Sequence, residues 1–495
     1  MTKLSGLLAR RRAGVLLHIT SLPGTQACGD LGADARAFVD FLAKCGATVW
    51  QTLPVTPTHF DGSPYQSMSA HAGETRLISV RELVSDGWLP ESALHDNNAR
   101  SNDRHQLSLQ QAYQGFLKRG DIAEYKRFVQ INGYWLPDYA LYVVLREAHG
   151  EQAWMHWPQP LRDRDESALA AARARYEREI DRVCFEQFVF FLQWERLRQY
   201  ANEKGVALLG DMPIFVALDS ADVWVERHYF DLDTEGRPNH IAGVPPDYFS
   251  TTGQRWGNPL YRWECMEADN FRWWLDRMKT LQRLFDGIRI DHFRGFEAYW
   301  EIPSDQPTAV VGRWVKAPGH ALLARFFDVF PEDQLSLIAE NLGFITPEVE
   351  ALRTEFNLPG MAILQFGFDG SPDNPAYPGN HVKNCVVYSG THDNDTTLSW
   401  FSMLSEEQRS RVLDASGYPD LAMPRALMAC AMASRAQLAI VPMQDILELG
   451  EGFRMNTPGT SSPENWSWRF QWHQLRDEQA EWLQQAIASG VRAAA

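Results

Sequence analysis

The chain has 495 residues, of which 45% are hydrophobic and 22% are charged. This is the composition of a folded protein with a large core. The formal net charge of -16 argues against nucleic acid and anionic membranes as partners, because both require basic patches. The six cysteines are scattered without a CxxC pair, which predicts reduced thiols in the cytoplasm. No stretch approaches the length of a membrane span.

Short apolar runs bounded by Gly, Pro or Asp alternate with helical patterns, an order typical of βα units and a parallel sheet. The first run follows Arg10, Arg11 and Arg12, and His18 ends it too early for the core of a signal peptide. The predicted strands are VLLHI (15–19), TVWQTLPV (48–55), VALLGDM (206–212), DGIRID (286–291), LSLIAE (335–340), AILQFGF (362–368), CVVYSG (385–390) and LAIVPM (438–443). They predict an α/β fold, a (β/α)8 TIM barrel, with its active site at the C-terminal ends of the strands.

Two intervals between these strands are too long for ordinary βα connections. The first contains the charged helical pattern RDRDESALAAARARYEREIDR and predicts a helical subdomain inserted at residues 80–180, with its charges on a solvated face. The second, residues 213–282, is rich in Trp, Pro, Gly and Tyr. We therefore predict one catalytic barrel over residues 1–495 with two inserted subdomains.

Acidic residues stand where five of the predicted strands end: Asp211, Asp291, Glu340, Asp393 and Asp445. A single acid at such a place is usually a turn or helix-cap residue, and we keep that interpretation for Asp445. For Asp291, Glu340 and Asp393 together, a catalytic function is favoured, because paired carboxylates are the equipment for cleaving glycosidic bonds.

The neighbours of these acids differ along the chain. Arg289 and Asp291 share one face of a strand, and an arginine beside the carboxylate keeps it ionised, as a nucleophile requires; a structural ion pair is the alternative. Glu340 follows an apolar strand without an adjacent cation, which suits an acid/base. Asp393 stands beside His392, where a third carboxylate stabilises positive charge in the transition state. A metal site is the alternative there, although no HxxxH spacing is present.

Other chemistries find little support in the sequence. It contains no GxSxG nucleophile elbow, no P-loop and no GxGxxG dinucleotide motif. No cofactor and no metal is therefore predicted. The 18 tryptophans favour flat apolar platforms of the kind that suit sugar rings, although many tryptophans serve only as core.

RIDHFRG (289–295), IAENLG (338–343) and GTHDN (390–394) resemble the nucleophile, acid/base and transition-state motifs of the amylomaltases, 4-α-glucanotransferases of glycoside hydrolase family 77. The resemblance covers most of the chain. Its other landmarks are LHITSLPG (17–24), SPYQSMSAHAG (63–73), GDMPIFVALDSADVW (210–224), GVPPDYFSTTGQRWGNPLY (243–261), NTPGT (456–460) and NWSWR (465–469). Family members often have Asn-Pro where this chain has Glu74-Thr75, a departure that concerns local loop geometry. The chain resembles the family's short form, without a large N-terminal extension.

The resemblance implies Asp291 as nucleophile, Glu340 as acid/base and Asp393 as stabiliser. It also implies a flexible lid loop over the cleft, residues 247–259, although Trp256 taken alone indicates only a core tryptophan in a Gly-rich turn. The residues that it implies as sugar-binding are Ser63, Tyr65, Asp211, Gln254, Trp256, Arg289, His292, His392 and Asn465.

The predicted function is transfer of α-1,4-glucan segments to a glucan or glucose acceptor, by double displacement with retention of configuration. The transferase part of this prediction rests on the resemblance. A retaining α-glucan hydrolase with the same three carboxylates is the nearest alternative. A catalytically silent starch-binding protein is a second, which the intact acid trio argues against, because a binding module needs no matched acid and nucleophile.

Overall fold

The computed structural model describes residues 6–24, 26–94, 102–120, 122–246, 250–331 and 335–492. Eight parallel strands form one sheet in the order β10-β11-β12-β1-β2-β3-β6-β9. Ala339 in β9 donates its N–H to the carbonyl of Pro359, just before β10, at 2.9 Å, so the two edge strands meet and the sheet forms a nearly closed barrel. This confirms the predicted (β/α)8 barrel. Its strands are β1 (Arg12–Leu16), β2 (Val49–Gln51), β3 (Ala207–Met212), β6 (Gly287–Ile290), β9 (Leu337–Ala339), β10 (Gly360–Ile363), β11 (Cys385–Tyr388) and β12 (Leu438–Pro442).

Helices surround the barrel and fill the long connections. The helix α18 follows the last strand and packs against α1 and α16, joining the two ends of the chain. The helices are α1 (Ala33–Cys45), α2 (Val80–Ser85), α3 (Asn102–Arg119), α4 (Ala123–Ile131), α5 (Leu136–Ala148), α6 (Gln159–Arg162), α7 (Glu166–Arg175), α8 (Glu177–Glu203), α9 (Ala221–Val225), α10 (Trp263–Ala268), α11 (Arg272–Leu284), α12 (Gly319–Val329), α13 (Pro347–Glu355), α14 (Thr397–Met403), α15 (Glu406–Ser416), α16 (Arg425–Ala433), α17 (Met443–Ile446) and α18 (Asp477–Ser489).

The barrel strands are apolar on both faces because each face packs against a different core. In β12, Leu438 and Ile440 belong to the cluster inside the barrel. Ala439 and Val441 belong to the larger cluster between the barrel and its helices. Side chains alternate along a strand, so a strand buried on both sides reads as a continuous apolar run. This is why all eight strands are visible in the sequence.

Most strand boundaries differ from the prediction by one or two residues, and the second strand, predicted to reach Val55, ends at Gln51. Two further differences have a clear physical reason. The first strand starts at Arg12, whose N–H donates to the carbonyl of Gln437 at 2.7 Å, and it ends at Leu16 before His18. Pairing with the neighbouring strand decides this boundary, and the apolar run does not. In the predicted strand 362–368, Leu364–Phe366 is a 3-10 turn, because a buried turn is as apolar as a strand.

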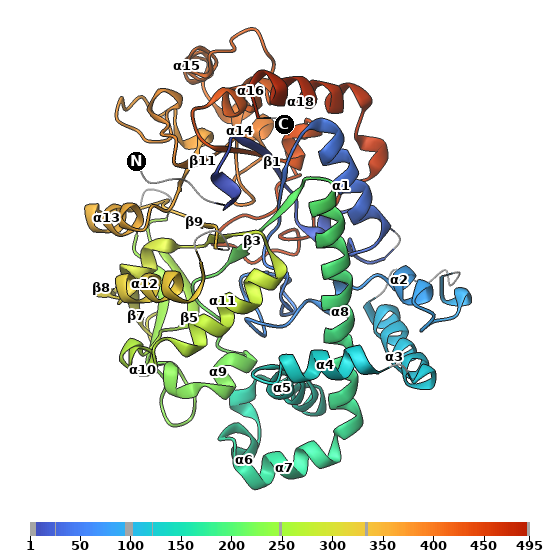
Figure 1. Ribbon diagram of the computed structural model, residues 1–495. Helices are drawn as coiled ribbons and strands as arrows, with labels where there is room; N and C mark the ends of the chain where they lie inside the picture. Colours follow the sequence, from blue (N-terminus) through green and yellow to red (C-terminus); the bar gives the residue numbers. More distant parts are fainter. Residues whose placement is uncertain are drawn as a thin grey trace.

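The connection between β2 and β3 is largely helical, as the charged pattern predicts. Helices α4 to α7 form a separate group at the bottom of Figure 1. The 27-residue helix α8 runs from this group up to the barrel, where it packs against α1 and β3. The division into inserted subdomains with the boundaries 80–180 and 213–282 stays a prediction.

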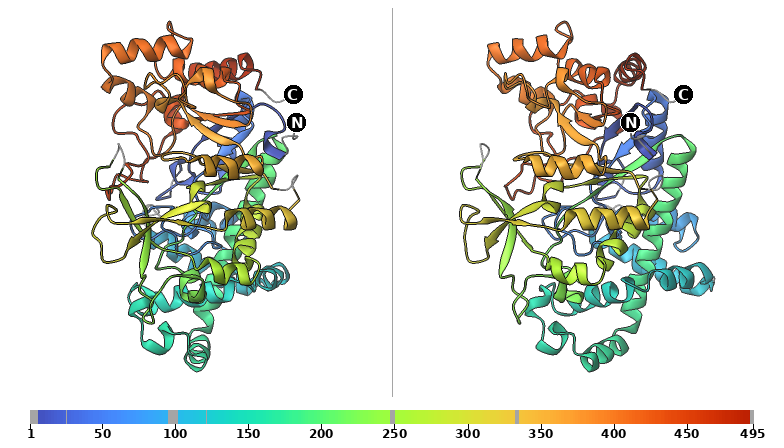
Figure 2. Two further views of the ribbon diagram at one scale, coloured as in Figure 1. Left: turned by 90° about the vertical axis from the view of Figure 1, so that its left-hand side faces the viewer. Right: turned by 60° about the vertical axis from the view of Figure 1, so that its left-hand side comes forward.

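A second, antiparallel sheet has the order β5-β4-β7-β8 and stands at the left edge of both views in Figure 2. Its strands are β4 (His240–Val244), β5 (Gln254–Pro259), β7 (Ala298–Pro303) and β8 (Arg313–Lys316). The prediction of a loop at 253–259 is therefore wrong: β5 pairs with β4, and Gly253 and Gly257, both with positive φ, permit the tight turn into it and the irregular register within it. The predicted lid residues 247–249 lie outside the described residues.

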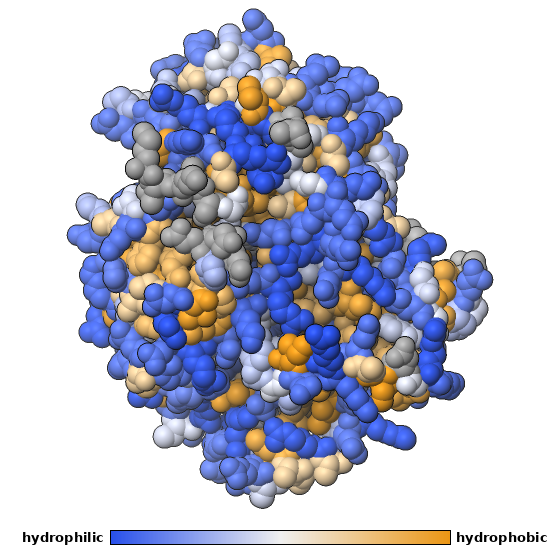
Figure 3. Space-filling model, in the orientation of Figure 1, coloured by the Kyte–Doolittle hydropathy of each residue, from blue (hydrophilic) through white to orange (hydrophobic). Residues whose placement is uncertain are grey.

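The face of the molecule seen in Figure 3 is mostly hydrophilic, with apolar residues in separate patches. Within the part of the chain that the structure describes, no helix combines the length and apolarity needed to cross a membrane. All six cysteines are free, in agreement with the prediction of reduced thiols.

Candidate active site

Asp211 and Arg289 form a buried ion pair at the C-terminal end of the barrel interior. They are register partners on the adjacent strands β3 and β6. Leu209, two residues before Asp211, packs inside the barrel, so the period of the strand directs Asp211 inward as well. One terminal nitrogen of Arg289, Nη1, donates to both carboxylate oxygens of Asp211, at 2.8 and 2.7 Å. Both residues are almost fully buried, and charges so far from water require such a partner.

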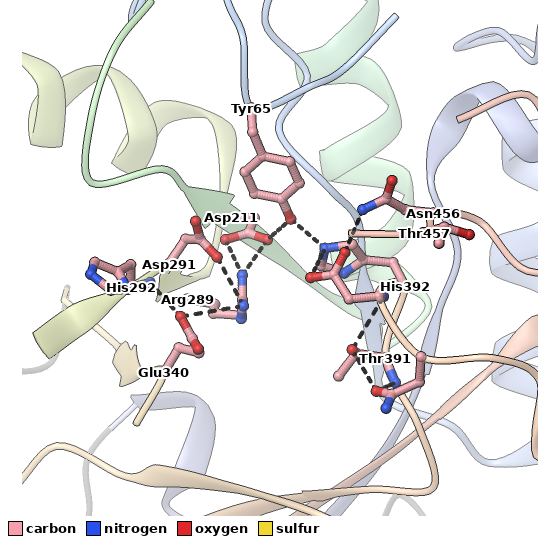
Figure 4. A network of polar contacts seen from close by, with 12 residues as sticks. Tyr65, Asp211, Arg289, Asp291, His292, Glu340, Thr391, His392, Asn456 and Thr457 are labelled. Atoms are coloured by element: carbon pink, nitrogen blue, oxygen red, sulfur yellow. Dashed lines mark hydrogen bonds and ion pairs between the residues drawn. The ribbon is translucent and has the colours of Figure 1, made fainter. Parts of the chain in front are cut away.

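The other terminal nitrogen of Arg289, Nη2, faces the two acids expected to perform the chemistry (Figure 4). It lies 3.0 Å from Oδ1 of Asp291 and 3.8 Å from Oε2 of Glu340. Because both contacts end on the same nitrogen, the two carboxyl groups are close enough to flank one glycosidic bond. The expectation that Glu340 lacks a cation is corrected here, since the arginine side chain reaches from β6 to the end of β9.

Burial dominates the electrostatics of this pair. It raises the pKa of Asp291 well above its usual range, against the positive charge of Arg289, and the negative charge of Glu340 adds to the rise. Burial also raises the pKa of Glu340, again opposed by Arg289. Two acids that share one arginine bind protons as a pair. At least one proton is therefore held at a higher pH than an exposed carboxyl group permits.

His292 orients Glu340 through its backbone. Its φ of 53° lies in the left-handed region that few residues other than glycine adopt, and this turn directs the His292 N–H to Oε2 of Glu340. The imidazole ring stands edge-on to Trp256, with centroids 4.8 Å apart. Burial lowers the pKa of His292 to about 3, so the ring is neutral. Its Nε2 is buried and has no hydrogen-bond partner among the described residues.

Asp393 lies in the loop after β11 and is held by two side chains. Nε2 of His392 is 3.3 Å from its Oδ2, and the amide of Asn456 donates to its Oδ1 at 2.7 Å. Burial acts to raise the pKa of Asp393, but the charge of His392 and these hydrogen bonds outweigh burial and hold the pKa at about 2. Asp393 is therefore ionised at neutral pH.

Tyr65 connects the two halves of the site (Figure 4). Its hydroxyl donates to Oδ2 of Asp211 at 2.8 Å and lies 2.8 Å from Nε2 of His392. A phenol has one proton, and Asp211 takes it, so Nε2 of His392 is the donor in the second contact. The ring of Tyr65 also stacks on that of His392, with centroids 5.4 Å apart. Polar contacts thus run without a break from Asp291 to Asp393.

Tyr65, Arg289, Asp291, His292, Glu340 and Asp393 line a cleft of about 2370 Å³, larger than the ~300–1,000 Å³ of a typical small-molecule site. Asp211 and His392 lie buried directly behind these residues. The volume of the cleft suits a chain of several sugar units. Of the remaining predicted residues, Ser63, Gln254, Trp256 and Asn465 also line it. The side chain of Asn465 accepts from the N–H of Thr457 at 3.1 Å, so it also fixes the shape of its own loop.

The chain was compared with known proteins. The family model for 4-alpha-glucanotransferase, glycoside hydrolase family 77, matches residues 17–475. The chain belongs to this family. The 4-alpha-glucanotransferase of Thermus thermophilus is 47% identical over 475 residues, covering 93% of this chain and 94% of the relative. That of Synechocystis is 44% identical and covers 95% of this chain and 96% of the relative.

Solved structures agree with this assignment. The amylomaltase of Streptococcus agalactiae, determined in complex with acarbose, superimposes with a TM-score of 0.94 at 36% identity, covering 98% of this chain and 100% of the other. The amylomaltase of Corynebacterium glutamicum, 19% identical with a TM-score of 0.75, covers 97% of this chain and 75% of its own and shares the fold. The family 77 prediction and the 4-α-glucanotransferase activity are thereby confirmed, in preference to the hydrolase alternative.

The sequence did not identify two side chains that shape this glucanotransferase site. Asn456, which fixes Asp393, begins the NTPGT motif, but an asparagine in a Gly/Pro-rich stretch ordinarily indicates a turn. Trp466 packs against the rings of Tyr65 and His392, with centroids 5.7 and 6.0 Å apart. Neither belongs to a periodic element, so only the motif to which each belongs was a signal.

Asp445, interpreted from the sequence as a turn or helix-cap residue, has a structural role. It is fully buried and accepts hydrogen bonds from the hydroxyls of Ser389 and Thr397, each at 2.7 Å, and from the Thr397 N–H at 3.0 Å. It thereby fixes both ends of the loop that carries Asp393. Glu74, where the chain departs from the family pattern, caps the 3-10 turn Thr75–Leu77 and accepts from the N–H of Arg76 at 3.0 Å.

A search of the described ranges finds no group of three or more His, Cys, Asp or Glu side chains arranged to hold a metal ion. His392 and Asp393, for which a metal site was the alternative, contact Tyr65 and Asn456 instead.

Proposed function

We propose that the enzyme transfers α-1,4-glucan segments to another glucan or to glucose, with Asp291 as nucleophile and Glu340 as acid/base. Asp291 attacks the anomeric carbon while Glu340 protonates the departing glycosidic oxygen, and a glycosyl ester forms on Asp291. The 4-hydroxyl of the acceptor then gives its proton to Glu340 and displaces Asp291, so configuration is retained. The observation that carries this proposal is the contact of both carboxyl groups with one nitrogen of Arg289.

The first step requires a charge on Asp291 and a proton on Glu340. The raised pKa of both acids supports a pair that still holds one proton at neutral pH. We assign the negative charge to Asp291, because it lies 3.0 Å from Arg289 whereas Glu340 lies 3.8 Å away. The proton then resides on Glu340, where the leaving oxygen needs it.

Asp393 is proposed to stabilise the positive charge that develops on the sugar. Its pKa of about 2 keeps it ionised at neutral pH, and a charge fixed in position before the reaction stabilises a transition state in which the opposite charge develops. The hydrogen bond from Asn456 and the contact with His392 hold the carboxylate in place before substrate arrives.

Substrate contacts are assigned to the remaining predicted residues: Ser63, Tyr65, Asp211, Gln254, Trp256, Arg289, His292, His392 and Asn465. The two histidines support this assignment, because Nε2 of His292 and Nδ1 of His392 are buried without a hydrogen-bond partner in the described part of the chain. Buried polar atoms are rarely left unpaired, and sugar hydroxyls supply both donors and acceptors. No metal or cofactor is required, since the chain provides every group that the reaction uses.

Transfer in place of hydrolysis requires that water be kept from the glycosyl ester. We propose that residues 250–253, which precede β5, cover the ester as a lid together with Trp256. Trp256 packs against His292, the neighbour of the nucleophile, which places an apolar ring beside the reacting centre. We place the enzyme in the cytoplasm, in accordance with its six free thiols, and expect no nucleic acid or membrane partner.

A time course with maltotriose tests the proposal. Transfer yields free glucose together with oligosaccharides longer than maltotriose, which chromatography separates. If glucose and maltose are the only products, the donor and acceptor assignment fails. Asp291→Asn abolishes the reaction while binding of a long maltooligosaccharide remains measurable; substantial activity in that variant would exclude Asp291 as nucleophile.

A further inference from the structure

Arg294 is the charged residue of the RIDHFRG motif to which the proposed chemistry gives no task. It lies in the 3-10 turn Phe293–Phe296, three residues after the nucleophile, and is 4% exposed. Its Nη1 donates to the carbonyl of Phe344, and its Nε donates to that of Ala298 at 3.4 Å. The guanidinium lies 3.7 Å from the centre of the Trp314 ring.

No carboxylate within the described ranges forms an ion pair with Arg294 at 4.0 Å or less. The two acids nearest in sequence are bound by other cations: Asp291 by Arg289 and Glu297 by Lys316. Removing an unpaired cation from water is costly, and a ring face together with carbonyl groups offsets this cost only in part. The directional bonds of Arg294 must therefore serve something other than charge neutralisation.

The bond to Phe344 ends on the segment that follows the acid/base. Leu342 and Gly343 line the cleft, and Gly343 has a φ of 79°. The near end of the segment is fixed by Asn341, whose side chain accepts from the N–H of Met361 at 2.8 Å and donates to Glu350 at 2.8 Å. Phe344 is 68% exposed, and its ring stacks on Trp314, with centroids 6.5 Å apart, and lies 5.9 Å from the Arg294 guanidinium. The far end is therefore anchored by the same pair, Arg294 and Trp314.

We infer that Arg294 is a positioning residue: by fixing the far end of the segment 341–344 to the turn that carries the nucleophile, it sets the distance between Asp291 and the carboxyl group of Glu340. Trp314 is the platform that holds the guanidinium in place. The inference rests on the proposed role of Glu340 as acid/base. Arg294 would thus control how Asp291, which follows β6, and Glu340, which follows β9, are placed relative to each other.

The test separates proton donation from nucleophilic attack. Maltotriose needs a proton on its leaving oxygen, whereas α-maltosyl fluoride releases fluoride without one. With either donor, the bond to the anomeric carbon breaks and an ester with Asp291 forms. Displacement of about 1 Å at a catalytic group costs on the order of 100-fold. For Arg294→Lys we expect kcat/KM with maltotriose to fall by about 100-fold. First-turnover fluoride release should stay near the wild-type rate.

A second readout uses azide, which attacks the anomeric carbon without a general base. It should restore turnover of α-maltosyl fluoride in Arg294→Lys, giving maltosyl azide and free Asp291. Trp314→Leu, which removes the platform but keeps the arginine, should show the same selective defect in weaker form. If Arg294→Lys does not fold, Trp314→Leu tests the inference in its place. Equal losses with both donors, or no loss with maltotriose, would overturn the inference.

Two controls distinguish failure of the inference from failure of the proposed function. Glu340→Ala must itself lose maltotriose turnover selectively and respond to azide; if it does not, the role of Glu340 is wrong. Arg277→Lys is the matched control, because Arg277 is equally buried, donates to a carbonyl and lies within 5.4 Å of two tryptophan rings, but the carbonyl belongs to Pro213. Its losses should be equal with both donors.

Discussion

Removing the hydroxyl of Tyr65 tests whether the polar network of the site acts as one unit. Tyr65→Phe keeps the ring that stacks on His392 and deletes two contacts of 2.8 Å, one to Asp211 and one with His392. Asp211 retains both hydrogen bonds from Arg289. The free-energy cost of losing the Tyr65 hydrogen bond to Asp211 is therefore at the low end of the range for hydrogen bonds to charged groups. His392 Nε2 retains only Asp393, at 3.3 Å.

The expected cost follows from these contacts. Each lost hydrogen bond contributes about 1–1.5 kcal/mol, so the pair contributes about 2–3 kcal/mol. Because ~1.4 kcal/mol corresponds to a factor of ten in rate, kcat/KM for maltotriose should fall by about 30- to 150-fold. Both contacts orient groups around the developing charge, so most of the loss should appear in kcat and little in KM.

Tyr142→Phe is the matched control. The hydroxyl of Tyr142 donates to Asp219 at 2.8 Å, and Asp219 is also bound by Arg146. This repeats the tyrosine–aspartate–arginine arrangement of the site, but it lies in the helical connection between β2 and β3. Initial rates of glucose release from maltotriose, with urea unfolding of each variant, complete the comparison. Wild-type activity is expected for Tyr142→Phe. A loss below threefold in Tyr65→Phe, or equal losses in both variants, would refute the reasoning.

Three other variants give independent outcomes. Asn456→Ala deletes a hydrogen bond that favours ionised Asp393, so its pKa should rise from about 2 toward 3.8. The resulting loss of stability in urea should be full at neutral pH and shrink as the pH falls through that interval. Arg492→Met should lower the unfolding free energy by about 3 kcal/mol without changing activity at 25 °C, because the fully buried guanidinium donates to five backbone carbonyls; unchanged thermal unfolding would contradict this. Asp211→Asn should shift both limbs of the pH–rate profile to lower pH.

The parts of the site that could be predicted lie on regular elements. Period two along the strand brings Arg289 and Asp291 to one face, where they lie 3.0 Å apart, and the rule that barrel strands carry chemistry at their C-terminal ends brings Asp291 and Glu340 into one group. These inferences need only the alternation of side chains along a strand and the knowledge of which strand end is C-terminal. The roles of individual residues stay predictions, although the geometry supports them.

The parts that could not be predicted depend on side-chain reach or on irregular backbone. The contact of Arg289 with Glu340 crosses from one strand end to another, and sequence neighbours do not reveal it. Asn456 approaches Asp393 from a segment 63 residues further along the chain. The strand β5 was missed because Gly253, Gly257 and the polar residues between them are typical of a loop. Only the pairing with β4 makes this segment a strand.

The pH prediction for Asp211→Asn follows from how one arginine serves three carboxyl groups. Asp211 takes both bonds of Nη1, and its negative charge offsets much of the positive charge that Asp291 and Glu340 would otherwise experience. The charge of Asp211 raises the pKa of both acids. Burial raises them more, and Arg289 opposes both effects. Without that charge, Arg289 attracts both acids more strongly, so both pKa values fall. The acid limb, where Asp291 gains a proton, and the alkaline limb, where Glu340 loses one, should therefore move together to lower pH. Unchanged limbs would show that Asp211 does not set the proton affinity of the catalytic pair, and an alkaline shift of either limb would contradict the sign of this argument.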